Sequence, residues 1–141
     1  MIPWVHLDTA SVPGGEGELK LMRRGDEFSI MAGNITLMNS RMSGSEIALA
    51  ELACDRLRGR RHCRVLIGGY GMGFTLRAAL DLLPSSATVV VSELIPAVVE
   101  WNRGVLVRSP HGLRRGAARY RQPEPAEPLP GPCGDGSGLV G

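Results

Sequence analysis

The sequence predicts an α/β protein in which an N-terminal antiparallel β meander precedes the opening strands of a parallel sheet. Three observations support this fold class. Residues 1–42 contain short segments that alternate between apolar and polar side chains, as half-buried strands do. Residues 43–103 follow the order helix, strand, glycine-rich loop, helix, strand, helix, which is how an open α/β sheet begins. Residues 104–141 lose both patterns and are rich in proline and glycine.

The meander is predicted from three strand candidates and two turns. Residues 19–22 alternate in polarity, and Arg-Gly-Asp at residues 24–26 forms a turn. Residues 28–31 and 35–38 are two further strands, joined by Ala-Gly-Asn at residues 32–34, where Gly and Asn tolerate positive φ. Because a meander of this size is not stable alone, we expect it to pack on the residues that follow.

A helix is predicted after the meander. Residues 43–46, Ser-Gly-Ser-Glu, fit a capping box in which the Ser43 hydroxyl accepts from an early N–H and Glu46 reaches back. Gly59 should end the helix. Its apolar residues recur at helical spacing, at Ile47, Ala50, Cys54 and Leu57.

Two short apolar runs then predict parallel strands. Residues 64–67, Arg-Val-Leu-Ile, are typical of a strand buried on both faces of a sheet, and the β-branched residues 87–92 predict its neighbour. Residues 74–83 are rich in Leu and Ala and predict the connecting helix. Pro96 suits the first turn of a last helix over residues 97–103. Beyond it, the prolines and glycines of residues 104–141 predict a mostly disordered tail.

Composition argues against several classes of function. The net charge of +2 is too small to indicate binding to nucleic acid or to an anionic membrane. No segment is apolar for long enough to span a membrane, and the N-terminus carries no secretory signal, so a cytoplasmic location is expected. The three cysteines show no CxxC spacing, which argues against a disulfide framework and against a zinc site; no metal is expected.

A glycine-rich loop, Gly68-Gly69-Tyr70-Gly71-Met72-Gly73, follows the first predicted parallel strand directly. Glycines let the backbone turn tightly and let a ligand approach it, and the next helix offers N–H groups and a positive dipole end. Glu93 ends the second strand, twenty residues after Gly73, where an acid can accept both ribose hydroxyls. The loop and the acid predict the nucleotide-side half of a nucleoside pocket, with Gly69, Gly71 and Gly73 touching the ligand through their backbone. The expected ligand-binding residues are Gly68, Gly69, Tyr70, Gly71, Gly73 and Glu93.

The glycine spacing helps to choose the ligand. In the dinucleotide fingerprint G-x-G-x-x-G read from Gly69, the third glycine would fall on Phe74, which disfavours a fragment of an NAD-dependent dehydrogenase. The chain has Gly69-x-Gly71-x-Gly73 instead, which suits a ligand of the S-adenosylmethionine type, since that ligand has no pyrophosphate. The alternative without a ligand is a tight β–α turn with Glu93 exposed at a strand end.

Two stretches resemble motifs of the spermidine synthase family. Residues 65–73 are similar to its first motif, and residues 93–100 to the acid-x-x-P-x-V-V-E stretch that follows. The meander and the helix start at residues 43–46 also match the family layout. The resemblance covers roughly residues 18–103. It implies a Rossmann-like methyltransferase sheet, binding of decarboxylated S-adenosylmethionine or of S-adenosylmethionine itself with Glu93 on the ribose, and aminopropyl transfer to an amine as the family reaction.

The chain also departs from the family pattern. Tyr70 stands where the family usually has an acid within the glycines, and Gly-Ser-Glu at residues 44–46 replaces a Tyr-His-Glu-like triplet. The segment with the family's catalytic aspartate has no counterpart. We therefore assign no catalytic residue and expect an N-terminal part of a larger enzyme, with a truncated or frameshifted end after Gly104. The acids that follow Glu100 all lie in the tail, at Glu124, Glu127 and Asp135.

Two other functions stay open: a methyltransferase that uses S-adenosylmethionine, and a truncated fragment without catalysis. A sheet with two parallel strands leaves an open edge and an uncovered apolar face, which favour self-association such as a homodimer. The expected partner is otherwise a small nucleoside ligand, with no nucleic acid and no membrane.

Overall fold

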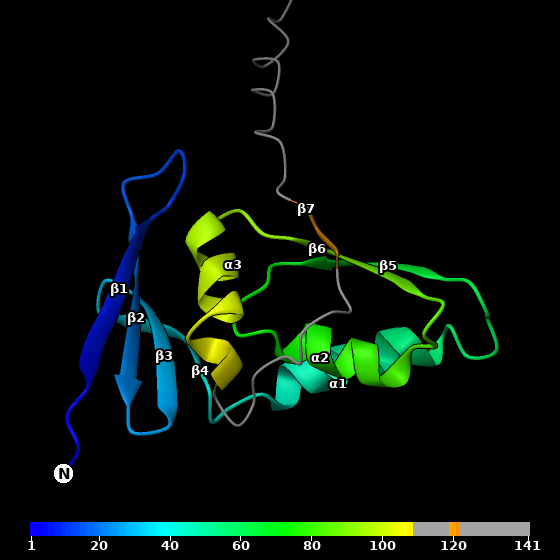
Figure 1. Ribbon diagram of the computed structural model, residues 1–141, viewed down its shortest axis with the longest axis horizontal. Helices are drawn as coiled ribbons and strands as arrows, with labels where there is room; N and C mark the ends of the chain where they lie inside the picture. The colour runs from blue at the N-terminus through cyan, green and yellow to red at the C-terminus, as the bar shows by residue number, and fades with distance from the viewer. Residues whose placement is uncertain (109–118, 122–141) are drawn as a thin grey trace, which may run out of the picture.

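The computed structural model describes residues 1–108 and 119–121. Its elements form two sheets, one of four antiparallel strands in sequential order and one of three parallel strands. Figure 1 shows the antiparallel meander beside the α/β part, with a helix between them. The predicted fold class, a meander followed by the opening of a parallel sheet, is confirmed.

The meander buries one face and exposes the other. Along β2, Leu19 and Leu21 are buried while Lys20 is exposed, as the alternation predicts. The hairpin between the last two strands turns at Gly33, whose φ of 57° is in the left-handed region. The meander's strands are β1 (Val5–Ser11), β2 (Glu18–Arg24), β3 (Glu27–Ala32) and β4 (Ile35–Asn39).

The α/β part follows the predicted order of helices and strands. Strands β5 and β6 are parallel, in a register that pairs Arg64 with Thr88 and Gly68 with Ser92. In Figure 1, α1 and α2 lie together on one side of these strands, and α3 lies toward the meander. The elements are α1 (Gly44–Asp55), β5 (Arg64–Gly68), α2 (Phe74–Leu82), β6 (Thr88–Ser92), α3 (Pro96–Arg103), η1 (Leu106–Arg108) and β7 (Arg119–Arg121).

Three local predictions are wrong. Helix α1 ends at Asp55, before the predicted end at Gly59. Strand β5 is not buried on both faces: Ile67 is 8% exposed, but Leu66 on the opposite face is 71% exposed. The capping box does not form either, because Ser43 makes no side-chain cap and Glu46 Oε2 instead accepts from the hydroxyl of Ser45 at 2.8 Å. Helix α1 begins with a backbone bond, from the N–H of Ile47 to the carbonyl of Ser43.

The described part of the tail contains two elements that the sequence did not predict: η1, in which Leu106 is buried, and strand β7. Strand β7 pairs in parallel with β6, with Arg119 opposite Val90 and Arg121 opposite Ser92. The predicted disorder of the tail otherwise falls on residues 109–118 and 122–141, outside the described residues.

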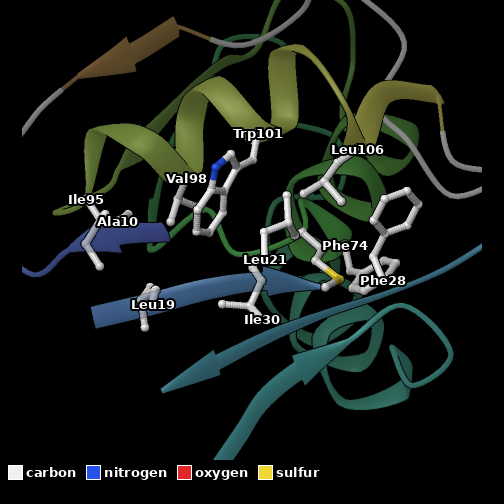
Figure 2. Close-up of a cluster of buried hydrophobic side chains, with 11 residues drawn as sticks. Ala10, Leu19, Leu21, Phe28, Ile30, Phe74, Ile95, Val98, Trp101 and Leu106 are labelled. Atoms are coloured by element: carbon white, nitrogen blue, oxygen red, sulfur yellow. The ribbon is translucent and has the colours of Figure 1, made fainter. Parts of the chain in front are cut away.

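Two hydrophobic clusters form the core. The first joins the meander to α3 and includes Leu21 and Trp101, which face each other in Figure 2. The second packs α1 and α2 on the parallel strands and includes Val91, whose exposed fraction is zero. Tyr70 packs against both clusters. The glycine-rich loop therefore lies at the junction of the two cores.

Candidate functional site

Three left-handed glycines shape the loop between β5 and α2. The φ angles of Gly69, Gly71 and Gly73 are 89°, 53° and 80°. A side chain rarely adopts these angles, which explains why glycine occupies every second position. Gly73 is also the N-cap of α2, so the loop leads directly from the carboxyl end of β5 into the helix.

Glu93 lies beside this loop. It follows β6 directly, and since β5 and β6 are parallel, their carboxyl ends meet at the same edge of the sheet. The side chain is only 8% exposed. Its Oε2 accepts a hydrogen bond from the N–H of Tyr70 at 2.7 Å, and its Oε1 accepts one from the N–H of Ile95 at 2.9 Å. The predicted acid and the predicted loop are thus in direct contact.

Several N–H groups of the loop are bonded within the protein. Gly69 donates to the carbonyl of Ser92 at 2.7 Å, and Gly73 donates to the carbonyl of Tyr70 at 2.8 Å. The N–H of Tyr70 is held by Glu93. These hydrogen bonds fix the shape of the loop. Because the N–H groups are already bonded, a ligand would contact the carbon and carbonyl atoms of this backbone.

The start of the loop is open on its outer side. Gly68 and Gly69 are both exposed, and a Cβ placed on either residue would meet no atom within 4 Å. A ligand can therefore approach the backbone there closely. This open backbone lies next to Glu93, at the carboxyl edge where open α/β sheets bind their ligands.

Two residues that hold the loop were missed by the sequence analysis. Asn102 Nδ2 donates to the carbonyl of Gly71 at 2.6 Å, and Met38 Sδ accepts from the N–H of Met72 at 3.1 Å. The position of Asn102 carried a signal, because it is a polar residue on the buried face of α3, next to Trp101. Met38 carried none, since its strand is distant in sequence.

Tyr70 is half-buried at the junction of the two cores. Burial raises the pKa of its phenol, and the charge of Arg103 opposes this shift in part. The phenol is therefore neutral at physiological pH. The loop thus presents an aromatic ring with a neutral hydroxyl at this position.

No group of three metal-ligating side chains is found in the described part of the chain. Across residues 1–108 and 119–121, no helix is long and apolar enough to cross a membrane. Two described cavities lie away from the predicted site residues. One of 350 Å³ lies between α1 and α2, lined among others by Ile47 and Arg77. The other, of 610 Å³, is lined among others by Arg24 of β2 and by Arg41, which follows β4.

Sequence comparison finds no matching family model and no matching curated protein. Solved structures do match. A spermidine synthase in complex with the transition-state analogue AdoDATO has a TM-score of 0.60 at 19% identity, over 82% of this chain and 39% of its own. The spermidine synthase from Thermotoga maritima has a TM-score of 0.58 at 19% identity, over 84% of this chain and 41% of its own. A probable spermidine synthase from Corynebacterium glutamicum has a TM-score of 0.56 at 12% identity, over 85% of this chain and 44% of its own.

At 12–19% identity, these structural matches show the fold alone. The chain spans about two fifths of the length of the solved structures it matches. The geometry of the glycine loop and of the buried Glu93 is observed in this chain itself. The chain is therefore spermidine synthase-like in fold, as the resemblance of its motifs implies.

Proposed function

We propose that residues 68–73 and Glu93 form the nucleoside side of a site for decarboxylated S-adenosylmethionine or S-adenosylmethionine. The observation that carries this proposal is the buried Glu93 carboxylate, 2.7 Å from the N–H of Tyr70 and beside the open backbone of Gly68 and Gly69. A carboxylate oxygen can accept more than one hydrogen bond, so Glu93 can hold the loop and also accept from ribose hydroxyls.

The free-energy cost of burying a carboxylate supports a binding role for Glu93. Burying a carboxylate is unfavourable unless it is well paired, and here two backbone N–H groups stabilise it at the sheet edge. A turn alone could be closed by a small polar residue without this cost. A preorganised acceptor at the carboxyl end of a parallel strand is the arrangement that holds a ribose in open α/β sheets.

The family reaction that accompanies this site is aminopropyl transfer, which needs a carboxylate to take the proton of the attacking amine. Within the described residues after Glu93, the only acid is Glu100, whose side chain is 68% exposed and paired with Arg103. We therefore propose ligand binding for this chain and assign it no catalytic residue. Methyl transfer from S-adenosylmethionine is the alternative reaction, and a fragment without catalysis is the alternative to both.

The test is calorimetry with decarboxylated S-adenosylmethionine, S-adenosylmethionine and methylthioadenosine. We expect the wild-type chain to bind at least one of them and Glu93→Gln to weaken binding by about tenfold or more, since a hydrogen bond to a charged group contributes about 1.5–3 kcal/mol. Glu100→Gln is the matched control, because it removes an exposed acid of the next helix, and it should bind as the wild type does.

Thermal unfolding of each variant separates weaker binding from loss of the fold. Binding of the decarboxylated form above the others would favour aminopropyl transfer, and preference for S-adenosylmethionine would favour methyl transfer. No heat with any of the three ligands, at high protein concentration, would refute the binding site and support the fragment.

A further inference from the structure

The glycine loop is held by two residues that lie outside β5 and α2, the elements it joins. Asn102 belongs to α3, and Met38 belongs to β4 of the meander. Asn102 bonds to Gly71 and Met38 to Met72, which are adjacent residues in the second half of the loop. The loop's conformation therefore depends on elements that a β–α turn by itself would not need.

Asn102 makes the shorter of the two contacts. It is 4% exposed, and its Nδ2 donates to the carbonyl of Gly71 at 2.6 Å and to the carbonyl of Val98 at 2.8 Å. The bond to Val98 lies within α3 and fixes the side-chain rotamer, so that the second N–H aims at the loop. A buried amide with both protons bonded holds its partner in one position.

Met38 contacts the same pair of residues. Its Sδ accepts from the N–H of Met72 at 3.1 Å, and a Cβ placed on Gly71 would lie 2.8 Å from Sδ and 2.9 Å from Cε. The thioether is therefore packed directly on the backbone of Gly71. Met38 Sδ and Asn102 Nδ2 together fix the orientation of the peptide units around this glycine.

We propose that Asn102 and Met38 are positioning residues for the nucleoside site, through which α3 and the meander set the loop opposite Glu93. This inference rests on the proposed function. Gly71 has a φ of 53°, and as a glycine it has many backbone conformations available when nothing holds it. If it is ordered beforehand, the ligand does not have to order the loop, and affinity is higher.

The test compares Asn102→Ala with Trp101→Phe. Trp101 is the neighbouring residue of α3, and its Nε1 donates to the meander, at Asp8 Oδ2 over 2.6 Å, rather than to the loop. We expect Asn102→Ala to weaken binding of the ligand found by calorimetry by about tenfold and to speed amide exchange at Met72. Trp101→Phe should lower the melting temperature and leave both affinity and exchange at Met72 unchanged.

Met38→Leu is a second test of the positioning role, because it keeps the apolar volume and removes the sulfur acceptor. It should weaken binding several-fold, and it carries the test if Asn102→Ala does not fold. Wild-type affinity in both variants would overturn the inference while leaving the proposed function intact. If the wild-type chain binds no ligand, the proposed function fails, and unchanged exchange at Met72 in both variants would overturn the positioning role as well.

Discussion

At Gly71, the backbone angle and the close packing both require glycine. Its φ is 53°, and an added Cβ would lie 2.8 Å from Met38 Sδ. Gly33 has a similar φ of 57° but nothing within 4 Å of an added Cβ, so it isolates the cost of the angle. We expect Gly33→Ala to cost about 1–2 kcal/mol and Gly71→Ala about 2–4 kcal/mol in urea unfolding. Equal costs would show that Met38 yields without strain.

Asp8 contributes to the stability of the folded protein in a way that depends on pH. The hydrogen bond from Trp101 is the main cause that lowers the pKa of its carboxyl, and the N–H of Thr9 adds to it. A lowered folded-state pKa stabilises the protein above the unfolded value of about 3.9, and this stability is lost as pH falls through the folded pKa. The melting temperature of Asp8→Asn should therefore approach that of the wild type as pH is lowered from 5 to 2.5. A constant difference would contradict this linkage.

At the residue scale, the sequence predicts the site where spacing along one strand–loop–helix unit defines it. The glycines and Glu93 belong to this local pattern, and the structure brings them together. Met38 and Asn102 could not be predicted in the same way, because their contacts to the loop join residues 34 and 31 positions apart. Such contacts depend on how the meander and α3 dock, which no local pattern encodes.

Helix α1 is apolar on both faces, which is unusual for an element covered on one side only. Ala50 is 2% exposed on its inner face, whereas Leu49 and Leu52 on the outer face are 60% and 72% exposed. We expect Leu52→Gln to change the free energy of unfolding by no more than about 0.5 kcal/mol and to reduce self-association in sedimentation velocity. Ala50→Gln is the matched substitution on the inner face and should destabilise strongly. Unfolding by Leu52→Gln would show that the outer face is covered.

The difference between a covered and an exposed apolar face explains which elements the sequence predicts well. Strand β2 is recognisable because Leu19 and Leu21 alternate with polar residues. Strand β1 is missed because Ala10 is its only buried residue, so its apolar side chains do not mark a face. Strand β5 has the composition of a strand covered on both sides, but Leu66 remains exposed. Periodicity reports which residues are apolar, whereas burial also depends on whether a second layer is present.

At the scale of the whole molecule, the two cores should unfold together. Tyr70 packs on both clusters, and Glu93 and Asn102 bond the loop to the ends of β6 and α3. Leu21 belongs to the first cluster and Val91 to the second, and both have an exposed fraction of zero. Because each core supports the loop that joins them, damage to one should weaken the other.

Leu21→Ala should therefore lower the stability of the α/β part as well as the meander, by about 2–5 kcal/mol. Val91→Ala, the matched truncation in the second cluster, should in turn lower the protection of meander amides such as those of Leu21 and Ile30. Hydrogen exchange followed by mass spectrometry measures both regions in one sample. The meander needs the α/β part to cover its apolar face, so a single cooperative transition is expected in each variant. Loss of protection confined to the mutated cluster would show instead that the two cores fold independently and that the glycine loop only links them.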